Sequence, residues 1–457
     1  MSRQKFQGRT TNMQDVRKAI FIVITLLAAF ALLATSCGND DDSSDASNRE
    51  DALGDGSPLG DGSPLGDGSL GIVEVEAGDA IQIRSLQAIT GDVAFFGIPI
   101  DRATALAIED YGPIHGFDVD IGASLDDLCS ADGGAAAATT VLAEEDVVGV
   151  LGTSCSGAAA AAAPLLTNAG LVLISAGNTS PSLTSDLAGN AGENHHVGYF
   201  RTAHNDLFQG TAMAKFICKE LGLNTAASMH DGDPYTQGLA QAFNDAYENE
   251  GCTVTGFTAI NKGDTDMVPA LTELAAGNPE ALVFPLFQPE GDFVAEQYKN
   301  VAGLEDAVLV TADALLVDNF MKLPQAENVY ITGPDQNFEG NMNESTGRTA
   351  AEIAAEYEER YGETATSAFW AHGYDAAVLL LDAIKAASWL EDGSLWIDRQ
   401  GVRDYLFSVQ NYNAIIGNLS CDNFGDCGSS RIAVIQNIGG EENLDASFNN
   451  VLFRYAP

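Results

Sequence analysis

The residues with the clearest chemical potential lie in the stretch Val148–Gly157, VGVLGTSCSG, which an alanine run follows. A short apolar strand stops there at a turn of small residues, and a good helix former takes over. The first N–H groups of such a helix have no partners and carry partial positive charge, so they can bind an anion. Ser156 stands near the N-cap position, where its hydroxyl would add a hydrogen bond. The stretch fits either the carboxylate-binding corner of a small-molecule site or an ordinary strand-to-helix connection capped by serine.

Motifs for catalysis and for cofactors are missing or incomplete. No Gly-x-Gly-x-x-Gly follows a predicted strand, and no Gly-Lys-Ser/Thr phosphate loop is present. The segment Gly152–Ser156 approaches the Gly-x-Ser-x-Gly nucleophile elbow but lacks its second glycine. The histidines show no metal-binding spacing such as His-x-x-x-His. We therefore expect no enzyme, no cofactor and no metal site, and a hydrolase is the weaker alternative.

Length and charge narrow the class of protein further. The 457 residues, 46% of them hydrophobic, can bury large cores and suggest two or more domains. A net charge of −44 repels nucleic acid and anionic lipid, so neither is an expected partner. Such acidity is also typical of salty surroundings. It does not predict the charge of a ligand, which local groups decide.

The N-terminus has the features of an export signal. Basic residues precede an apolar run over Ala19–Leu33, and Ala34-Thr35-Ser36-Cys37 follows. The ending resembles a lipoprotein box, except that Ala34 stands where leucine is usual. We predict a signal peptide over 1–36 and lipidation of Cys37, which anchors the protein outside the cytoplasm on the membrane; an uncleaved anchor is the alternative.

Two features follow from the composition after Cys37. The acidic Gly/Ser/Asp-rich segment 37–79, with its repeated Leu-Gly-Asp-Gly-Ser-Pro, cannot bury enough apolar area to fold and is expected to be a hydrated tether. Six cysteines remain, and an even number in an exported protein suggests three disulfides. Six cysteines allow fifteen pairings, so their spacing alone does not assign partners. They are Cys129, Cys155, Cys218, Cys252, Cys421 and Cys427.

The globular part begins near Ala80 and alternates strands with helices. Strands are expected over 81–86, 119–121, 147–151, 171–174, 225–229, 252–257, 281–285 and 308–311. Helices are expected over 101–111, 135–145, 157–169, 207–221, 237–250, 267–276, 290–301, 349–361 and 369–387. This alternation predicts an α/β fold with mostly parallel sheets covered on both faces. Ligands in such sheets bind at the carboxyl ends of the strands.

Four segments resemble one known family. They are Ala88–Gly97, Leu125–Cys129, Ser154–Ser156 and Leu173–Pro181, the last with Ile-Ser-x-x-x-Thr-x-Pro. From about Ala80 to the C-terminus the chain is similar to the periplasmic leucine/isoleucine/valine-binding proteins of ABC transporters. The resemblance implies the type I periplasmic-binding-protein fold, with two Rossmann-like lobes joined by three crossover segments. Lobe 1 would hold residues 80–201 and 332–416, and lobe 2 residues 202–331 and 417–457.

The resemblance also implies a ligand site for the two charged ends of an amino acid. Ser156 and its backbone would bind the α-carboxylate. Gly177 would offer a carbonyl to the α-ammonium, and Thr179 would contact the same end. Tyr235 would come from the second lobe, and Asp313 would be the acidic partner of the ammonium, one methylene shorter than the family's glutamate. A lone aspartate after a strand is otherwise usually a helix cap.

Two aromatic residues and the cysteines take their expected roles from the same resemblance. Phe96 and Phe287 would form the wall of the site or belong to the core. Both lack the hydroxyl of tyrosine, so the wall would be drier and favour an apolar side chain on the ligand. Cys129–Cys155 would be a disulfide as in the family. Cys218 and Cys252 could cross-link the second lobe, and Cys421 and Cys427 could close a short loop.

Together these inferences predict a monomeric, lipid-anchored receptor that delivers an amino acid, branched-chain or otherwise apolar, to the permease of an ABC importer. Charge-assisted hydrogen bonds at both ends of the ligand would supply most of the affinity. Two alternatives stay open. One is a receptor of the same fold for amides, urea or aromatic acids. The other is a ligand-sensing domain that is not coupled to transport.

Overall fold

The computed structural model describes residues 65–338 and 340–457, which belong to one compact unit. The expected signal peptide, the lipidated Cys37 and the first part of the tether lie outside the described residues. Among the residues described, no helix combines the length and the apolar character needed to cross a membrane. The α/β class with mostly parallel sheets is confirmed.

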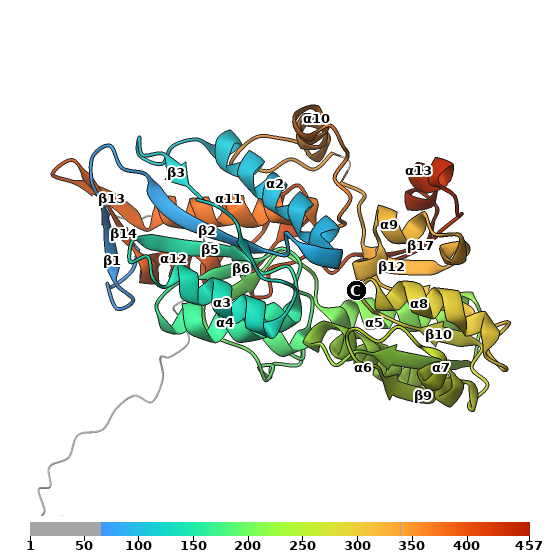
Figure 1. Cartoon of the computed structure of the whole chain (residues 1–457). Helices are drawn as coiled ribbons and strands as arrows, with labels where there is room; N and C mark the ends of the chain where they lie inside the picture. Colours follow the sequence, from blue (N-terminus) through green and yellow to red (C-terminus); the bar gives the residue numbers. More distant parts are fainter. Residues whose placement is uncertain (1–64, 339) are drawn as a thin grey trace, which may run out of the picture. The chain divides into compact units, whose positions relative to one another are not determined.

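The first lobe is built on a parallel sheet in the order β3-β2-β5-β6-β7, with β4 pairing to β2. Its strands are β2 (Ile81–Gln87), β3 (Val119–Asp120), β4 (Leu125–Asp126), β5 (Val147–Gly152), β6 (Leu173–Ser175) and β7 (Tyr199–Arg201). Helices α2 (Ala94–Tyr111) and α11 (Trp370–Ala386) cover one face, and α3 (Ala131–Val141) and α4 (Ser156–Asn168) cover the other (Figure 1). Successive side chains of a strand serve opposite faces: in β5, Val150 packs with α3 and α4, whereas Leu151 packs with α2 and α11.

The second lobe is built on a mixed sheet in the order β9-β8-β10-β11-β12-β17-β18, parallel up to β12 and antiparallel beyond it. Its strands are β8 (Thr225–His230), β9 (Thr253–Ala259), β10 (Ala281–Val283), β11 (Val308–Thr311), β12 (Tyr330–Pro334), β17 (Ile432–Gln436) and β18 (Val451–Tyr455). Helices α5 (Asp206–Lys215) and α6 (Pro234–Asn249) pack on one face. The other face carries α7 (Val268–Ala275), α8 (Glu290–Gln297) and α9 (Asp318–Met321).

Smaller elements complete the described chain. They are α10 (Ala350–Tyr361), α12 (Arg399–Ser408), α13 (Leu444–Phe448), β13 (Ser388–Glu391), β14 (Ser394–Asp398) and the hairpin of β15 (Tyr412–Ala414) with β16 (Gly417–Leu419). A π-helical turn, η3 (Phe216–Glu220), follows α5, and a 3₁₀ turn, η5 (Asp313–Leu315), follows β11.

The tether predicted over residues 37–79 includes a segment that belongs to the folded part of the protein. Within the last residues of the predicted tether lies β1 (Ile72–Val75), which pairs antiparallel with β14 in a three-stranded sheet. Val73 and Val75 of this strand are buried, while Ile72 and Glu74 are exposed. The glycine- and serine-rich composition around this short alternating segment masked it in the sequence.

The lobe boundaries expected at residues 331 and 416 also need correction. β12 belongs to the second sheet and runs to Pro334, so the second crossover begins after it. The chain after residue 416 stays with the first lobe, because Cys421 and Cys427 are buried in the core formed with α2 and α11. It joins the second sheet only at β17.

Candidate functional site

The predicted ligand-binding residues follow the carboxyl ends of parallel strands. Ser156 comes after β5, the loop with Gly177 and Thr179 after β6, and Asp313 after β11. Tyr235 lies in the first turn of α6, which follows β8. In an open α/β sheet this edge is where ligands bind, because loops and helix N-termini gather there.

Ser156 is the first residue of α4 rather than its cap. Cys155 holds the N-cap position and gives no side-chain hydrogen bond. The Ser156 hydroxyl instead accepts a hydrogen bond from the backbone N–H of Ser180, at 3.3 Å. The expected N-cap role of Ser156 is therefore wrong. Its hydroxyl holds the loop after β6 against the start of α4.

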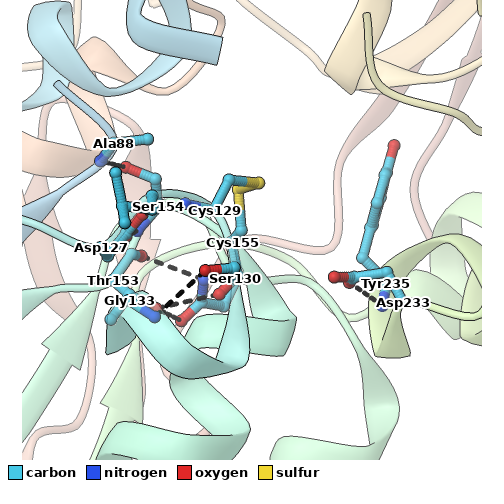
Figure 2. Close-up of a disulfide and its surroundings, with 12 residues drawn as sticks. Ala88, Asp127, Cys129, Ser130, Gly133, Thr153, Ser154, Cys155, Asp233 and Tyr235 are labelled. Carbon is cyan, nitrogen blue, oxygen red and sulfur yellow. Dashed lines mark hydrogen bonds between the residues drawn. A yellow bond between two sulfur atoms is a disulfide. The ribbon is translucent and has the colours of Figure 1, made fainter. Parts of the chain in front are cut away.

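A buried carboxylate and a disulfide fix the turn before α4 (Figure 2). The backbone N–H groups of Cys129 and Ser154 donate to Asp127, at 2.8 and 2.6 Å. Burial raises the pKa of Asp127 to about 7, against these hydrogen bonds. The Cys129–Cys155 disulfide joins the same two loops. This pairing, implied by the family resemblance, is confirmed.

The other two disulfides are also present. Cys218 pairs with Cys252 within the second lobe, and Cys421 pairs with Cys427 across a short loop. Among the described residues, no group of three or more His, Cys, Asp and Glu side chains could hold a metal ion.

Gly177 and Phe96 lie against each other. A β-carbon added at Gly177 would come within 3.1 Å of the Phe96 ring and 2.9 Å of the Ser154 carbonyl oxygen. The glycine therefore permits a close approach of the loop to the ring. Phe96 is buried, and its ring packs edge-on against Phe369 at 5.5 Å.

Asp313 is buried, and two side chains of the second lobe donate hydrogen bonds to one of its oxygens. Its Oδ1 accepts a hydrogen bond from the amide of Gln209 at 2.6 Å and another from the hydroxyl of Tyr235 at 3.3 Å. Burial raises the pKa of Asp313 to about 6, although both hydrogen bonds oppose the change. Burial and the nearby Asp313 raise the pKa of Tyr235 well above its usual value, so this hydroxyl keeps its proton.

Asp206, which the sequence analysis did not select, lies beside this group. It is fully buried as the first residue of α5, and its backbone N–H donates to the Thr179 carbonyl at 3.0 Å. Neither carboxylate oxygen has a hydrogen-bond partner of ordinary geometry among the described residues, and the same holds for the Thr179 hydroxyl. Burial and the charge of Asp313 raise the pKa of Asp206 well above the usual value, against the lowering effects of the Thr179 hydroxyl and of the Arg201 charge.

Neither Asp206 nor Asp313 forms an ion pair among the described residues. Against the effect of burial, the charge of the buried Arg201 lowers the pKa of Asp206, but Arg201 pairs with Asp426 through two hydrogen bonds, at 2.6 and 2.9 Å. Although burial opposes it, this pairing lowers the pKa of Asp426 below its usual value. Two acidic side chains therefore lie buried together without an ion-pair partner, and keeping both ionised destabilises the fold unless a cation binds beside them.

Phe287 borders a cavity between loops of the two lobes. The cavity has a volume of about 240 Å³ and is lined by Leu128 and Cys129 on one side and by Lys262 and Phe287 on the other. The centre of the Phe287 ring lies 5.2 Å from the centre of the Tyr235 ring. The hydroxyl of Tyr235 in turn donates to Asp313. The Lys262 ammonium lies 5.6 Å from the Phe287 ring centre.

The two lobes also touch directly near Ser156. The Ser180 hydroxyl donates to the Pro234 carbonyl at 2.9 Å, and a β-carbon at Gly157 would meet the Asp233 carboxylate at 2.4 Å. Figure 2 draws Asp233 where it caps α6 by accepting from the Tyr235 N–H. The first turn of α6 thus carries both an interlobe contact and Tyr235.

The structure therefore joins the predicted residues in two groups. Tyr235 contacts Asp313 and Phe287, and Phe96 lies against Gly177. Among the described residues, no hydrogen bond joins Ser156 to Asp313. The Ser156 hydroxyl accepts from the backbone N–H of Ser180, and the neighbouring Thr179 carbonyl accepts from the backbone N–H of Asp206, whose pKa burial and the charge of Asp313 raise. The sequence offered little reason to select Asp206 as a ligand-binding residue, because an acidic residue in the first turn of a helix is usually explained by the helix dipole.

The comparisons with known proteins define the class. A family model described as periplasmic binding protein matches residues 80–426. The chain therefore belongs to the periplasmic binding protein family.

Individual curated relatives match only part of the chain, and at low sequence identity. The leucine-, isoleucine-, valine-, threonine- and alanine-binding protein of Pseudomonas aeruginosa is 30% identical over 236 residues, which cover 50% of this chain and 59% of the relative. The chain spans 60% or less of the length of this and the next two curated relatives that it matches.

Two solved structures share the fold. LivJ of Streptococcus pneumoniae, in complex with isoleucine, has a TM-score of 0.66 and 20% identity over 83% of this chain and 99% of its own. A solute-binding protein of R. palustris, in complex with 4-hydroxybenzoate, has a TM-score of 0.63 and 17% identity over 78% of this chain and 93% of its own. At these identities the likeness concerns the fold alone.

Proposed function

We propose that this protein is an extracytoplasmic receptor that binds an amino acid between its two lobes and delivers it to an ABC importer. The observation that carries the proposal is the buried pair Asp206 and Asp313, neither of which forms an ion pair among the described residues, while the pKa of each is raised by burial. An α-ammonium group would supply the missing charge and the missing hydrogen-bond donors.

The opposite end of the ligand would lie at the first lobe. The start of α4 offers N–H groups and the Ser156 hydroxyl to a carboxylate, and Gly177 and Thr179 would contact the ammonium from the loop after β6. Ligand contacts with both lobes would favour the closed form, which the permease would recognise. The lipid on Cys37 would hold the receptor at the membrane.

The side chain of the ligand would lie between Phe96 and Phe287. Both rings are buried and neither carries a hydroxyl, which favours an apolar side chain. The names of relatives that bind leucine, isoleucine and valine support the same class of ligand.

A receptor for aromatic acids is the second candidate, because a protein of the same fold was solved with 4-hydroxybenzoate. An aromatic acid lacks the cation that would compensate Asp206 and Asp313, which favours the amino acid. Isothermal titration calorimetry with L-leucine, L-isoleucine, L-valine, 4-hydroxybenzoate, acetamide and urea tests the choice. Binding of one of the amino acids supports the proposal, and binding of only the other three compounds rejects it.

Coupling to transport needs a separate test. Permease and ATPase genes beside the gene of this protein, together with stimulation of the importer's ATPase by the ligand-loaded receptor, would support delivery. A gene neighbourhood with signalling partners alone would favour the sensory alternative.

A further inference from the structure

The side-chain amide of Gln209 has an orientation that its neighbours dictate. Its Nε2 donates to Asp313 Oδ1 at 2.6 Å, to the Thr332 carbonyl at 3.2 Å and to the Thr332 hydroxyl at 3.0 Å. The carbonyl can only accept, so the amide nitrogen must face this group. The amide oxygen of Gln209 must therefore point the other way.

That oxygen lies 2.5 Å from Nε2 of His204. An amide oxygen only accepts, so His204 must carry a proton on Nε2. Burial lowers the pKa of His204 to about 4, so the imidazole is neutral near pH 7 and this is its one ring proton. Its Nδ1 is then an acceptor, and it has no partner among the described residues.

We propose that His204 is a positioning residue for ligand binding: it holds the Gln209 amide so that Gln209 donates to Asp313 and keeps that carboxylate ionised for the ligand's ammonium. The proposal rests on the function proposed above. Both side-chain hydrogen bonds to Asp313 end on Oδ1, from Gln209 and Tyr235, so Oδ2 is the oxygen left for the ligand. Without His204, the buried Gln209 oxygen would lose its hydrogen-bond donor, and the amide could rotate so that its nitrogen no longer donates to Asp313.

The place of His204 in the fold suits this role. It lies in the first crossover, between β7 and α5, and its ring stacks on Phe369 at 6.0 Å. Phe369 in turn contacts Phe96. His204 thus connects the aromatic wall of the first lobe to the acidic group of the second.

The other charged and titratable groups around this network do not replace His204. Arg201 and Asp426 are paired with each other. His372 packs against the Phe369 ring at 5.1 Å, and burial lowers its pKa to about 3, so it is neutral too. Asp206 is the other acid near Asp313, and Tyr235 keeps its proton.

The test replaces the hydrogen-bonding ring with a ring of similar shape. His204→Phe removes the donor to Gln209 and keeps an aromatic partner for Phe369. We expect L-leucine affinity, measured by calorimetry, to fall about tenfold at pH 6, with a smaller loss at pH 8 where Asp313 ionises without help. His204→Gln, which brings back an N–H donor, should recover part of the loss.

His372→Phe is the matched control. It also changes a buried histidine that packs on Phe369, but no hydrogen bond joins His372 to Gln209. We expect it to leave the pH profile of binding unchanged. A His204→Phe profile that coincides with the wild-type profile, or a His372→Phe profile that shifts equally, would overturn the positioning role.

A second measurement needs neither a variant nor a ligand. The ¹⁵N chemical shifts of the imidazole of His204 in the wild-type protein distinguish the tautomers. We expect the proton on Nε2, and a proton on Nδ1 would overturn the proposal even if His204→Phe failed to fold. Because this measurement uses the ligand-free protein, a failure here is distinct from a failure to bind any amino acid, which would reject the proposed function.

Discussion

The two ends of the candidate site differ in how well their buried polar groups are satisfied. At the first-lobe end, Asp127 accepts N–H groups from the turn before α4, and the Ser156 hydroxyl accepts from Ser180. At the other end, neither carboxylate oxygen of Asp206 has a hydrogen-bond partner of ordinary geometry among the described residues, and Asp206 lies beside a second buried acid, Asp313. The buried polar groups of the first end are hydrogen-bonded within the protein, whereas the buried acids of the second end reduce the stability of the ligand-free fold.

This difference indicates where a ligand would contribute most. Buried polar groups in folded proteins are normally paired, and exceptions concentrate at functional sites. A ligand carboxylate would add to a frame that is already stable. A ligand ammonium would pair with the two buried acids and remove the free-energy cost of leaving them unpaired. We therefore expect the acidic end to dominate the affinity and its pH dependence.

The largest expected effect comes from removing the charge of Asp313. Asp313→Asn should weaken L-leucine binding by about a hundredfold or more, because truncating one partner of a buried charge pair costs about 2–5 kcal/mol. Calorimetry measures the change. Asp318→Asn, which alters a surface acid paired with Lys322 on α9, is the control and should bind normally. Unchanged affinity in Asp313→Asn would remove Asp313 from the site.

Asp206→Asn should separate stability from binding. Because the pKa of Asp206 is raised in the folded state, its carboxyl stabilises the fold below the unfolded pKa near 4, and this contribution is lost as pH rises through the folded pKa. At pH 8 the variant should therefore gain about 1–3 kcal/mol in free energy of unfolding, by analogy with an unsatisfied buried group. At pH 4 we expect no gain.

The same variant should bind L-leucine about tenfold more weakly, since a charge-assisted hydrogen bond is lost. Denaturant unfolding at the two pH values and calorimetry provide the measurements. Asp398→Asn is a suitable control, because Asp398 caps α12 in the first lobe and asparagine caps equally well. A destabilised Asp206→Asn at pH 8 would contradict the reading of Asp206 as an uncompensated acid.

The wild-type protein should show the same asymmetry in its pH dependence. The ammonium of the ligand binds ionised carboxylates, and the pKa of Asp313 is raised to about 6. Affinity should thus fall as pH drops below 6, by about tenfold per pH unit. Binding near pH 6 should also release protons, so the heat of binding should differ between phosphate and bis-Tris, two buffers that work at this pH and have different ionisation enthalpies. Equal heats after correction for dilution would show that neither acid changes its charge.

The sequence predicted the fold and the first-lobe end of the site better than the acidic end. The alternating strands and helices, the three disulfides and the position of Asp313 after β11 were all available from residue types and motif resemblance. These features depend on local pattern or on segments that resemble a family. The acidic end was only half predicted, because Asp206 becomes notable through burial without a partner, which no local pattern shows.

Other misses have a similar origin. β1 was assigned to the tether because it pairs with β14, more than 300 residues later in the sequence, and its own four residues carry little signal. The His204–Gln209 contact is local in sequence, but its meaning depends on Thr332 and Asp313 from other elements. Long-range packing, rather than residue type, decides these features.

The smallest expected effect on binding compares two disulfides of similar loop length. The Cys129–Cys155 bond closes 26 residues and the Cys218–Cys252 bond 34, so removing either by paired serine substitutions should cost about 2–4 kcal/mol in stability. Only the first joins the loops that carry the turn before α4. Its removal should therefore also weaken L-leucine binding a few-fold, whereas removal of the second should leave affinity unchanged at a temperature where both variants are folded. Equal losses of affinity would mean that the first-lobe end is not the local scaffold that its hydrogen bonds describe, and that stability of the whole molecule controls binding instead.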